Sequence, residues 1–174
     1  MLDENFNPII ADLGLGRIFG INMTLQLGTP LYMAPELLST IGDAEVTMKI
    51  DVYAFAVTLL SFFTESFRFL NKKIKNRKEF VSEIISGNRF EIPSNVPDFY
   101  KELITKCWDQ NPNERPSFDD IVNEFENNDG FILDGSDIDE VKDYINKIKN
   151  GSPEGTPTPT PERAYTETEE FDFG

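Results

Sequence analysis

Apolar residues recur at helical spacing through most of this chain, and their pattern predicts a mainly α-helical protein. Residues 49–64 are apolar on every face, which is typical of a helix that is buried on all sides. Residues 78–86 have an amphipathic pattern that stops at Gly87, as is usual at a helix end. A third helix is predicted to begin at Pro97 and Asp98, because proline and an acid are favoured in a first turn. Its apolar stripe consists of Phe99, Leu103, Ile104, Cys107 and Trp108.

Two more helices are predicted further along the chain. Ser117, followed by Asp120, resembles a capping box with a shorter acid. The helix that follows is expected to bury Ile121, Val122 and Phe125. Residues 137–149 carry acids in the first turn and lysines in the last, which suits the helix dipole. We expect their apolar stripe to pack back on the other helices, and the alternative is docking of a partner. The stripe consists of Ile138, Val141, Tyr144, Ile145 and Ile148.

The two ends of the chain are predicted to lack helices. Residues 9–11 form a short predicted strand, and residues 15–35 form a loop with several glycines and prolines. Residues 151–174 are rich in proline and poor in apolar residues, so we expect a disordered acidic tail. Four residues of this tail precede a proline and are candidate phosphorylation sites: Ser152, Thr156, Thr158 and Thr160.

Charge is distributed unevenly along the chain. The net charge is -15, and residues 124–174 hold 14 acids against 4 bases. This acidity argues against nucleic acids and anionic membranes as partners, because both attract basic surfaces. The exception is a basic run at residues 72–78, which we expect to be a solvated loop; an acidic substrate contact or a nuclear signal is the alternative.

Other features of the composition indicate an intracellular, cytoplasmic protein. No apolar run approaches the ~18 residues of a membrane helix, and no signal-peptide pattern is present. The single cysteine, Cys107, cannot form an internal disulfide, and beside Trp108 it is predicted to be a small buried apolar residue.

Four motifs occur in a fixed order along the chain. They are A-D-L-G-L-G-R at residues 11–17, T-P-L-Y-M-A-P-E at 29–36, D-V-Y-A-F at 51–55 and C-W-D-Q-N-P-N-E-R-P-S-F at 107–118. Together they resemble the activation segment and C-terminal lobe of a eukaryotic protein kinase, over about three quarters of the chain. The last motif resembles the tyrosine-kinase-like group.

This resemblance implies a partial kinase C-lobe, with helices around a buried central helix and a short β-hairpin at its start. We assign residues 1–127 to this lobe fragment, with the activation segment at 12–36. Residues 128–150 form an additional helix and 151–174 form the tail.

Several kinase motifs do not occur in these 174 residues. There is no G-x-G-x-x-G, no V-A-I-K-like strand and no histidine for an H-R-D triplet. The resemblance therefore implies that the N-lobe and the catalytic loop are missing. We expect a C-terminal fragment of a serine/threonine kinase that is inactive alone. ATP and Mg²⁺ are then cofactors of the complete kinase, and this chain alone binds neither. The alternatives are a non-catalytic module that binds a kinase or a protein substrate, and a decayed gene without a stable product.

The resemblance also assigns roles to single residues. Asp12 matches the magnesium-binding aspartate, and Gly14 gives the backbone freedom that its turn requires. Thr24 is the candidate regulatory phosphorylation site of the activation segment. Thr29 matches a threonine typical of serine/threonine kinases.

Three further residues have structural roles by resemblance. Glu36 and Arg115 are expected to form an ion pair that fixes the activation segment to the helices around residues 97–127. Asp51 matches an aspartate that accepts hydrogen bonds from the catalytic loop. Without that loop we expect a buried carboxylate that lacks donors, with a raised pKa.

Overall fold

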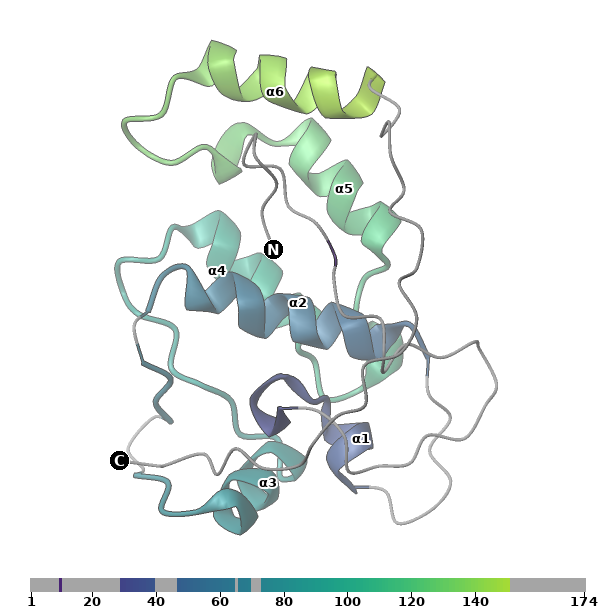
Figure 1. Cartoon of the computed structure of the whole chain (residues 1–174), viewed down its shortest axis with the longest axis vertical. Helices are drawn as coiled ribbons and strands as arrows, with labels where there is room; N and C mark the ends of the chain where they lie inside the picture. Colours follow the sequence, from purple (N-terminus) through teal and green to yellow (C-terminus); the bar gives the residue numbers. More distant parts are fainter. Residues whose placement is uncertain (1–9, 11–28, 40–46, 65, 70–72, 151–174) are drawn as a thin grey trace, which may run out of the picture.

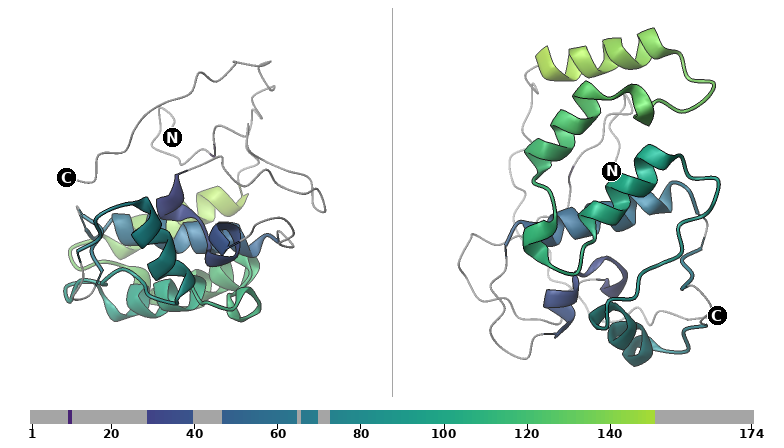
Figure 2. Two further views of the ribbon diagram at one scale, coloured as in Figure 1. Left: turned by 90° about the horizontal axis from the view of Figure 1, so that it is seen from below. Right: turned by 180° about the vertical axis from the view of Figure 1, so that it is seen from behind.

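The helices of the computed structural model are arranged in pairs along the long axis of the molecule (Figure 1). The structure describes residues 10, 29–39, 47–64, 66–69 and 73–150. Figure 1 shows one pair of helices at the bottom, a second pair in the middle and a third pair at the top, and the rear view in Figure 2 has the same order. From bottom to top these pairs are α1 (Pro35–Ser39) with α3 (Arg77–Ile85), α2 (Lys49–Ser61) with α4 (Asp98–Cys107), and α5 (Phe118–Asn127) with α6 (Ile138–Asn150).

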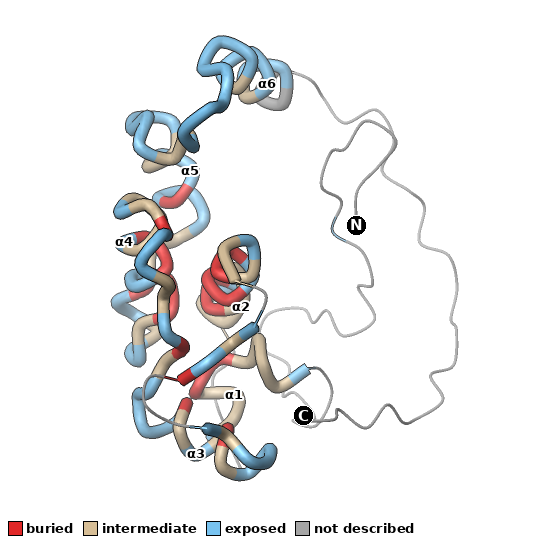
Figure 3. The backbone as a smooth tube through the Cα atoms, turned by 90° about the vertical axis from the view of Figure 1, so that its left-hand side faces the viewer, coloured by how far each residue is buried: buried red, intermediate tan, exposed pale blue. Residues whose placement is uncertain are grey.

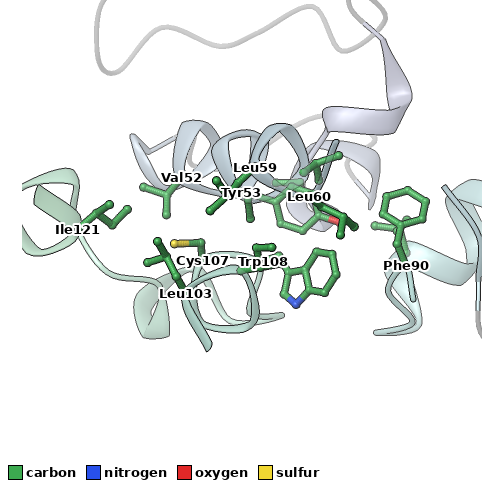
Figure 4. Packing of buried hydrophobic residues seen from close by; sticks show 14 of the residues in the cluster. Val52, Tyr53, Leu59, Leu60, Phe90, Leu103, Cys107, Trp108 and Ile121 are labelled. Atoms are coloured by element: carbon green, nitrogen blue, oxygen red, sulfur yellow. The ribbon is translucent and has the colours of Figure 1, made fainter. Parts of the chain in front are cut away.

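Helix α2 supplies the centre of the core. Its buried residues pack against α4 and the residue that follows it, chiefly Leu103, Ile104, Cys107 and Trp108 (Figure 4). Figure 3 shows buried positions on α2 and on the parts of α4 and α5 that face it, and further buried positions around α1 and α3. A mainly helical protein built around one central helix is the predicted fold class. The buried residues of α2 are Val52, Tyr53, Ala56, Val57, Leu59 and Leu60.

One face of α2 nevertheless reaches solvent, and here the prediction of burial on all sides is wrong. Asp51, Thr58 and Phe62 are exposed, Phe62 at 77%. They are seven and then four positions apart, so they share one face of the helix. The helix ends at Ser61 rather than at residue 64, and Phe62 is its C-cap. The two exposed positions inside the helix, Asp51 and Thr58, are polar, so the sequence of this face already differs from that of the buried faces.

Helix α3 begins and ends close to the predicted positions. The Asn76 side chain caps it by accepting a hydrogen bond from the Glu79 amide at 3.0 Å. Gly87 follows its end with φ +91°, a conformation that glycine adopts without steric cost. Beside α3 an antiparallel bridge joins Phe69 to Phe90, whose ring centroids are 5.0 Å apart. The sequence pattern did not predict this bridge.

Helix α5 has the predicted capping box. The Ser117 hydroxyl accepts from the Asp120 amide at 3.1 Å, and the Asp120 carboxylate accepts from the Ser117 amide at 2.9 Å. Ile121 is buried at 3% exposure and Phe125 is half-buried, but Val122 is 52% exposed. The predicted burial of Val122 is wrong, because successive helical residues point about 100° apart and Ile121 already faces the core.

Helix α6 packs back only in part. The Asp137 carboxylate accepts from the Asp139 and Glu140 amides at 3.0 and 3.1 Å, which starts the helix one residue later than predicted. Lys142 reaches Asp129 at 3.0 Å, and Val141 and Ile145 are half-buried. Ile138 and Tyr144 are exposed, so the predicted packing of the whole stripe is wrong at these positions. The Ile148 side chain lies outside the described residues.

The predicted loop at 15–35 contains regular structure at its end. A 3₁₀ helix, η2 (Pro30–Tyr32), is followed by α1, which starts at Pro35. Ile10 is exposed and is not part of a strand. The rest of the predicted hairpin and the tail at 151–174 lie outside the described residues. In the described ranges no helix is both long and apolar enough to span a membrane.

Adjacent residues of α5 give a test of this packing. We expect Ile121→Ala to lower the free energy of unfolding by about 2–5 kcal/mol, because it leaves a cavity in the core. Val122→Ala is the control and should change it by less than about 0.5 kcal/mol, since this side chain is largely in solvent. Urea unfolding followed by circular dichroism measures both, and equal losses would contradict the register of α5.

Candidate functional site

The segment around Thr29 leads directly into the candidate site. Thr29 is exposed, with extended backbone (φ -79°, ψ 114°), and its carbonyl accepts from the Tyr32 amide at 3.2 Å. Pro30 occupies the first position of η2, where its fixed φ suits the turn. Ala34 and Pro35 are buried, which anchors the entry to α1. Glu36 lies in the first turn of α1, where an acid is favoured.

Glu36 and Arg115 form the ion pair expected between them. Arg115 donates from Nη1 to Glu36 Oε1 at 2.7 Å and from Nη2 to Glu36 Oε2 at 2.8 Å. The side chain of Arg115 is 0% exposed and that of Glu36 is 19% exposed. Two parallel charge-assisted bonds fix the direction of both groups as well as their distance.

Two further donors of Arg115 bind backbone carbonyls. Nη1 also donates to the Lys49 carbonyl and Nε donates to the Asp109 carbonyl, both at 2.9 Å. In return the Lys49 ammonium donates to the Arg115 carbonyl. Arg115 therefore joins α1 and the first residue of α2 to the turn that follows α4.

A short helix sets the position of Arg115. The 3₁₀ helix η3 (Pro112–Glu114) is capped by Asn111, whose side chain accepts from the Asn113 amide at 3.1 Å. Arg115 is its C-cap, and its amide donates to the Pro112 carbonyl. The run N-P-N-E-R thus turns the chain sharply and directs the guanidinium into the core.

Tyr53 lies against two guanidinium groups. The Cζ atoms of Arg115 and Arg89 are 5.2 and 5.3 Å from its ring centroid, within cation–π range. Its hydroxyl is buried and has no hydrogen-bond partner among the described residues. Burial raises the pKa of Tyr53, and the two arginines partly oppose that shift.

Arg89 is held by carbonyl oxygens at its end of the site. It donates to the Trp108 carbonyl at 2.9 Å and to the Ile84 carbonyl at 3.2 Å. A further bond to the Gln110 side chain is 2.7 Å long. Burial lowers the pKa of Arg89. These bonds tie the end of α3 to the end of α4.

The expectation that Asp51 is buried is wrong. Its side chain is exposed, because it lies on the solvent-facing side of α2. Partial desolvation by neighbouring atoms still raises the pKa of its carboxyl group, in the expected direction.

The other predicted site residues lie outside the described residues. They are Asp12, Gly14, Thr24, Ser152, Thr156, Thr158 and Thr160. Within the described part, no three acidic or cysteine side chains are placed to hold a metal ion.

Sequence reasoning did not find three residues of the site: Lys49, Tyr53 and Arg89. Lys49 and Arg89 take part in the site through hydrogen bonds with backbone carbonyls. Every residue has a backbone carbonyl, so the residue type does not predict such a bond. Tyr53 lies inside the D-V-Y-A-F motif, so the motif could have indicated that it belongs to the site. Nothing in the sequence predicted its contacts with two arginines.

Comparison with known proteins decides the family. The family model described as "Protein tyrosine and serine/threonine kinase" matches residues 1–125. The chain belongs to the protein kinase family. The kinase match contains Thr29, Glu36, Asp51 and Arg115, and so covers the whole ion-pair site.

Curated kinases from two organisms resemble this chain. A probable serine/threonine-protein kinase of Dictyostelium discoideum is 34% identical over 128 residues, which are 73% of this chain and 9% of that kinase. The dual specificity protein kinase shkA of the same organism is 38% identical over 133 residues, or 72% of this chain and 24% of that kinase. A putative serine/threonine-protein kinase/receptor of Acanthamoeba polyphaga mimivirus is 32% identical over 123 residues, 70% and 7% of the two chains. This kinase chain thus spans less than a quarter of the length of each of these relatives.

The buried ion pair makes a quantitative prediction. Arg115→Ala removes the bidentate arginine partner of the partly buried Glu36 carboxylate, so we expect a loss of about 3–5 kcal/mol in the free energy of unfolding. Lys101→Ala, which removes an exposed pair with Asp98, is the control and should cost about 1 kcal/mol or less. Urea unfolding measures both, and an Arg115 variant as stable as the parent would contradict the structural role of the pair.

The thiol of Cys107 gives a pH-dependent test. Burial raises its pKa from 9.0 to about 12, so the folded protein keeps the proton that the unfolded chain releases. The resulting stability is fully present below about pH 9 and is lost as the pH rises towards about 12. We expect the melting temperature to fall less steeply over this range in Cys107→Ala than in the parent. At about pH 8 a disulfide reagent should react with the parent only in denaturant, and rapid reaction of the folded chain would contradict the burial.

Proposed function

We propose that this chain is the C-terminal part of the catalytic domain of a serine/threonine protein kinase. The complete protein then transfers a phosphoryl group from ATP to a serine or threonine hydroxyl of a protein substrate, inside the cell where ATP is available. The observation that carries this proposal is the kinase match over residues 1–125. The bidentate pair of Glu36 and Arg115, at the end of the T-P-L-Y-M-A-P-E motif, supports it.

The acceptor preference rests on two observations. Thr29 occupies the position where serine/threonine kinases carry a threonine, and its side chain is exposed at the start of η2. Several relatives described as serine/threonine kinases and two described as dual specificity kinases are each more than 30% identical to this chain. Both favour serine or threonine as acceptor.

We assign a positioning role to Arg115. Its bonds to Glu36 hold α1, and α1 follows directly on the segment that contains Thr29. Its bonds to the Lys49 and Asp109 carbonyls fix it to α2 and to the end of α4. Holding this end of the segment reduces the ordering that remains when a substrate hydroxyl binds beside it.

These 174 residues alone are proposed to be inactive. Phosphoryl transfer depends on a lysine, magnesium ligands and an aspartate that orients the hydroxyl. The sequence contains no H-R-D triplet and no G-x-G-x-x-G. In the complete kinase Mg²⁺ neutralises phosphate charge, and Asp12 is the residue of this chain proposed to hold it.

A second candidate function is a non-catalytic module that binds a kinase or a protein substrate. Its contact surface would be formed by large apolar side chains that lie in solvent. Among them are Phe62, Val122 and Ile138. This function would be supported if the 174-residue chain is folded and monomeric, binds such a partner, and is not part of a longer product with kinase activity.

Nucleotide binding tests the main proposal. We expect Mg²⁺-ATP to leave the melting temperature of the 174-residue chain unchanged, and no phosphate transfer to a generic protein substrate. A shift of several degrees would contradict the proposed inactivity. The transcript upstream of the Met1 codon should encode an in-frame H-R-D-x-x-x-x-N within about 20 residues.

The longer product supplies the control. It should phosphorylate serine or threonine, and Asp12→Asn should abolish transfer while leaving the fold unchanged. Tyrosine as the main acceptor, or full activity of the Asp12 variant, would contradict the assignment.

A further inference from the structure

Positive charge is concentrated at the start of α3. Residues 72–78 hold five of the 16 lysines and arginines of a chain whose net charge is -15. Four of them are described and all four are exposed: Lys73, Lys75, Arg77 and Lys78. We call these four residues the basic patch.

The charge of the basic patch is electrostatically unfavourable for α3, the helix at whose start it lies. Arg77 and Lys78 stand in the first turn of α3, where the helix dipole is positive and favours acids. None of the four forms an ion pair with a described carboxylate, whereas Lys101, Lys106 and Lys142 each have one at 3.0 Å. Glu79, the acid of that turn, accepts from the Lys75 amide at 2.9 Å. An anion bound here would remove an unfavourable interaction that the folded protein otherwise retains.

The opposite end of the molecule is acidic. Residues 118–150, which form α5 and α6, hold ten acids and three bases. Figure 1 shows these helices at the top and α3 at the bottom. Residues 151–174 follow α6 and hold six acids and one base. The tail is therefore repelled by the end to which it is attached and attracted by the other end.

The tail is long enough to reach α3. Its densest acidic stretch, residues 167–172, starts 17 residues after Asn150. At about 3.3 Å per residue that spacing spans about 55 Å when extended. A compact domain of 150 residues has a radius of gyration of about 15 Å, which corresponds to a sphere about 40 Å across, so the extended spacer spans it.

We propose that the acidic segment at residues 162–172 binds the basic patch of its own chain. Since α3 packs against α1, the bound segment lies beside the helix that carries Glu36. Phosphate on Thr156, Thr158 or Thr160 adds negative charge next to this segment and strengthens the contact. The inference goes beyond the proposed kinase function and does not depend on it.

Paramagnetic relaxation tests the contact in the full chain. A nitroxide is attached at Thr168→Cys; Cys107 stays unlabelled because it is buried. We expect loss of amide signal at residues 73–78. The signal should return in about 1 M NaCl, where the screening length is about 3 Å. It should also return in the triple variant Lys73→Glu, Lys75→Glu, Lys78→Glu.

Two controls make the result decisive. Glutamate at Lys101, Lys106 and Lys142 changes the net charge equally but leaves the patch intact, so the signal loss should persist. Mixing spin-labelled chain with isotope-labelled chain that lacks the nitroxide should give no loss. Signal loss in that mixture, loss spread evenly over all amides, or insensitivity to the patch variant would each overturn the proposal.

Discussion

The guanidinium of Arg115 is a full positive charge without solvent exposure, and the arrangement of three helices depends on keeping it paired. Removing such a group from water costs several kcal/mol, at the order of magnitude known for buried ions. That cost is offset by the Glu36 carboxylate, the carbonyls of Lys49 and Asp109, and the ring of Tyr53. Because these groups come from α1, α2 and the turn after α4, movement of any of these elements removes part of what offsets the charge.

Arg89 extends this constraint to α3. Its guanidinium also lies over the Tyr53 ring and binds carbonyls at the ends of α3 and α4. Two cations near one aromatic ring repel each other, and the carbonyls together with the carboxylates of Glu36 and Asp109 offset that repulsion. The core between the helices is thus apolar around α2, α3 and α4, and among the described residues its buried charge is that of Arg115, where α1, α2 and the turn after α4 meet.

Local signals in the sequence located most of the helices. Gly87 after α3 and the Ser117–Asp120 box at the start of α5 lie within three residues of the helix ends that they mark, so the sequence contains these signals. Exposure was less predictable, as Phe62, Val122 and Asp51 show. Whether an apolar or acidic residue is covered depends on elements distant in sequence. In the site, the motif predicted the pair of Glu36 and Arg115, but the roles of Lys49 and Arg89 depend on where backbone carbonyls lie after folding.

The 79 residues that separate Glu36 from Arg115 have a consequence for synthesis. At about 5–20 residues per second, a ribosome needs roughly 4–16 seconds to add Arg115 after Glu36. During this interval α1, α2 and α3 have left the ribosome or are leaving it, while the cation that joins them does not yet exist. Leu103 and Cys107 of α4, which pack against α2, are also synthesised only after α2. The nascent chain therefore exposes its most apolar helix for seconds, which is the state that chaperones recognise.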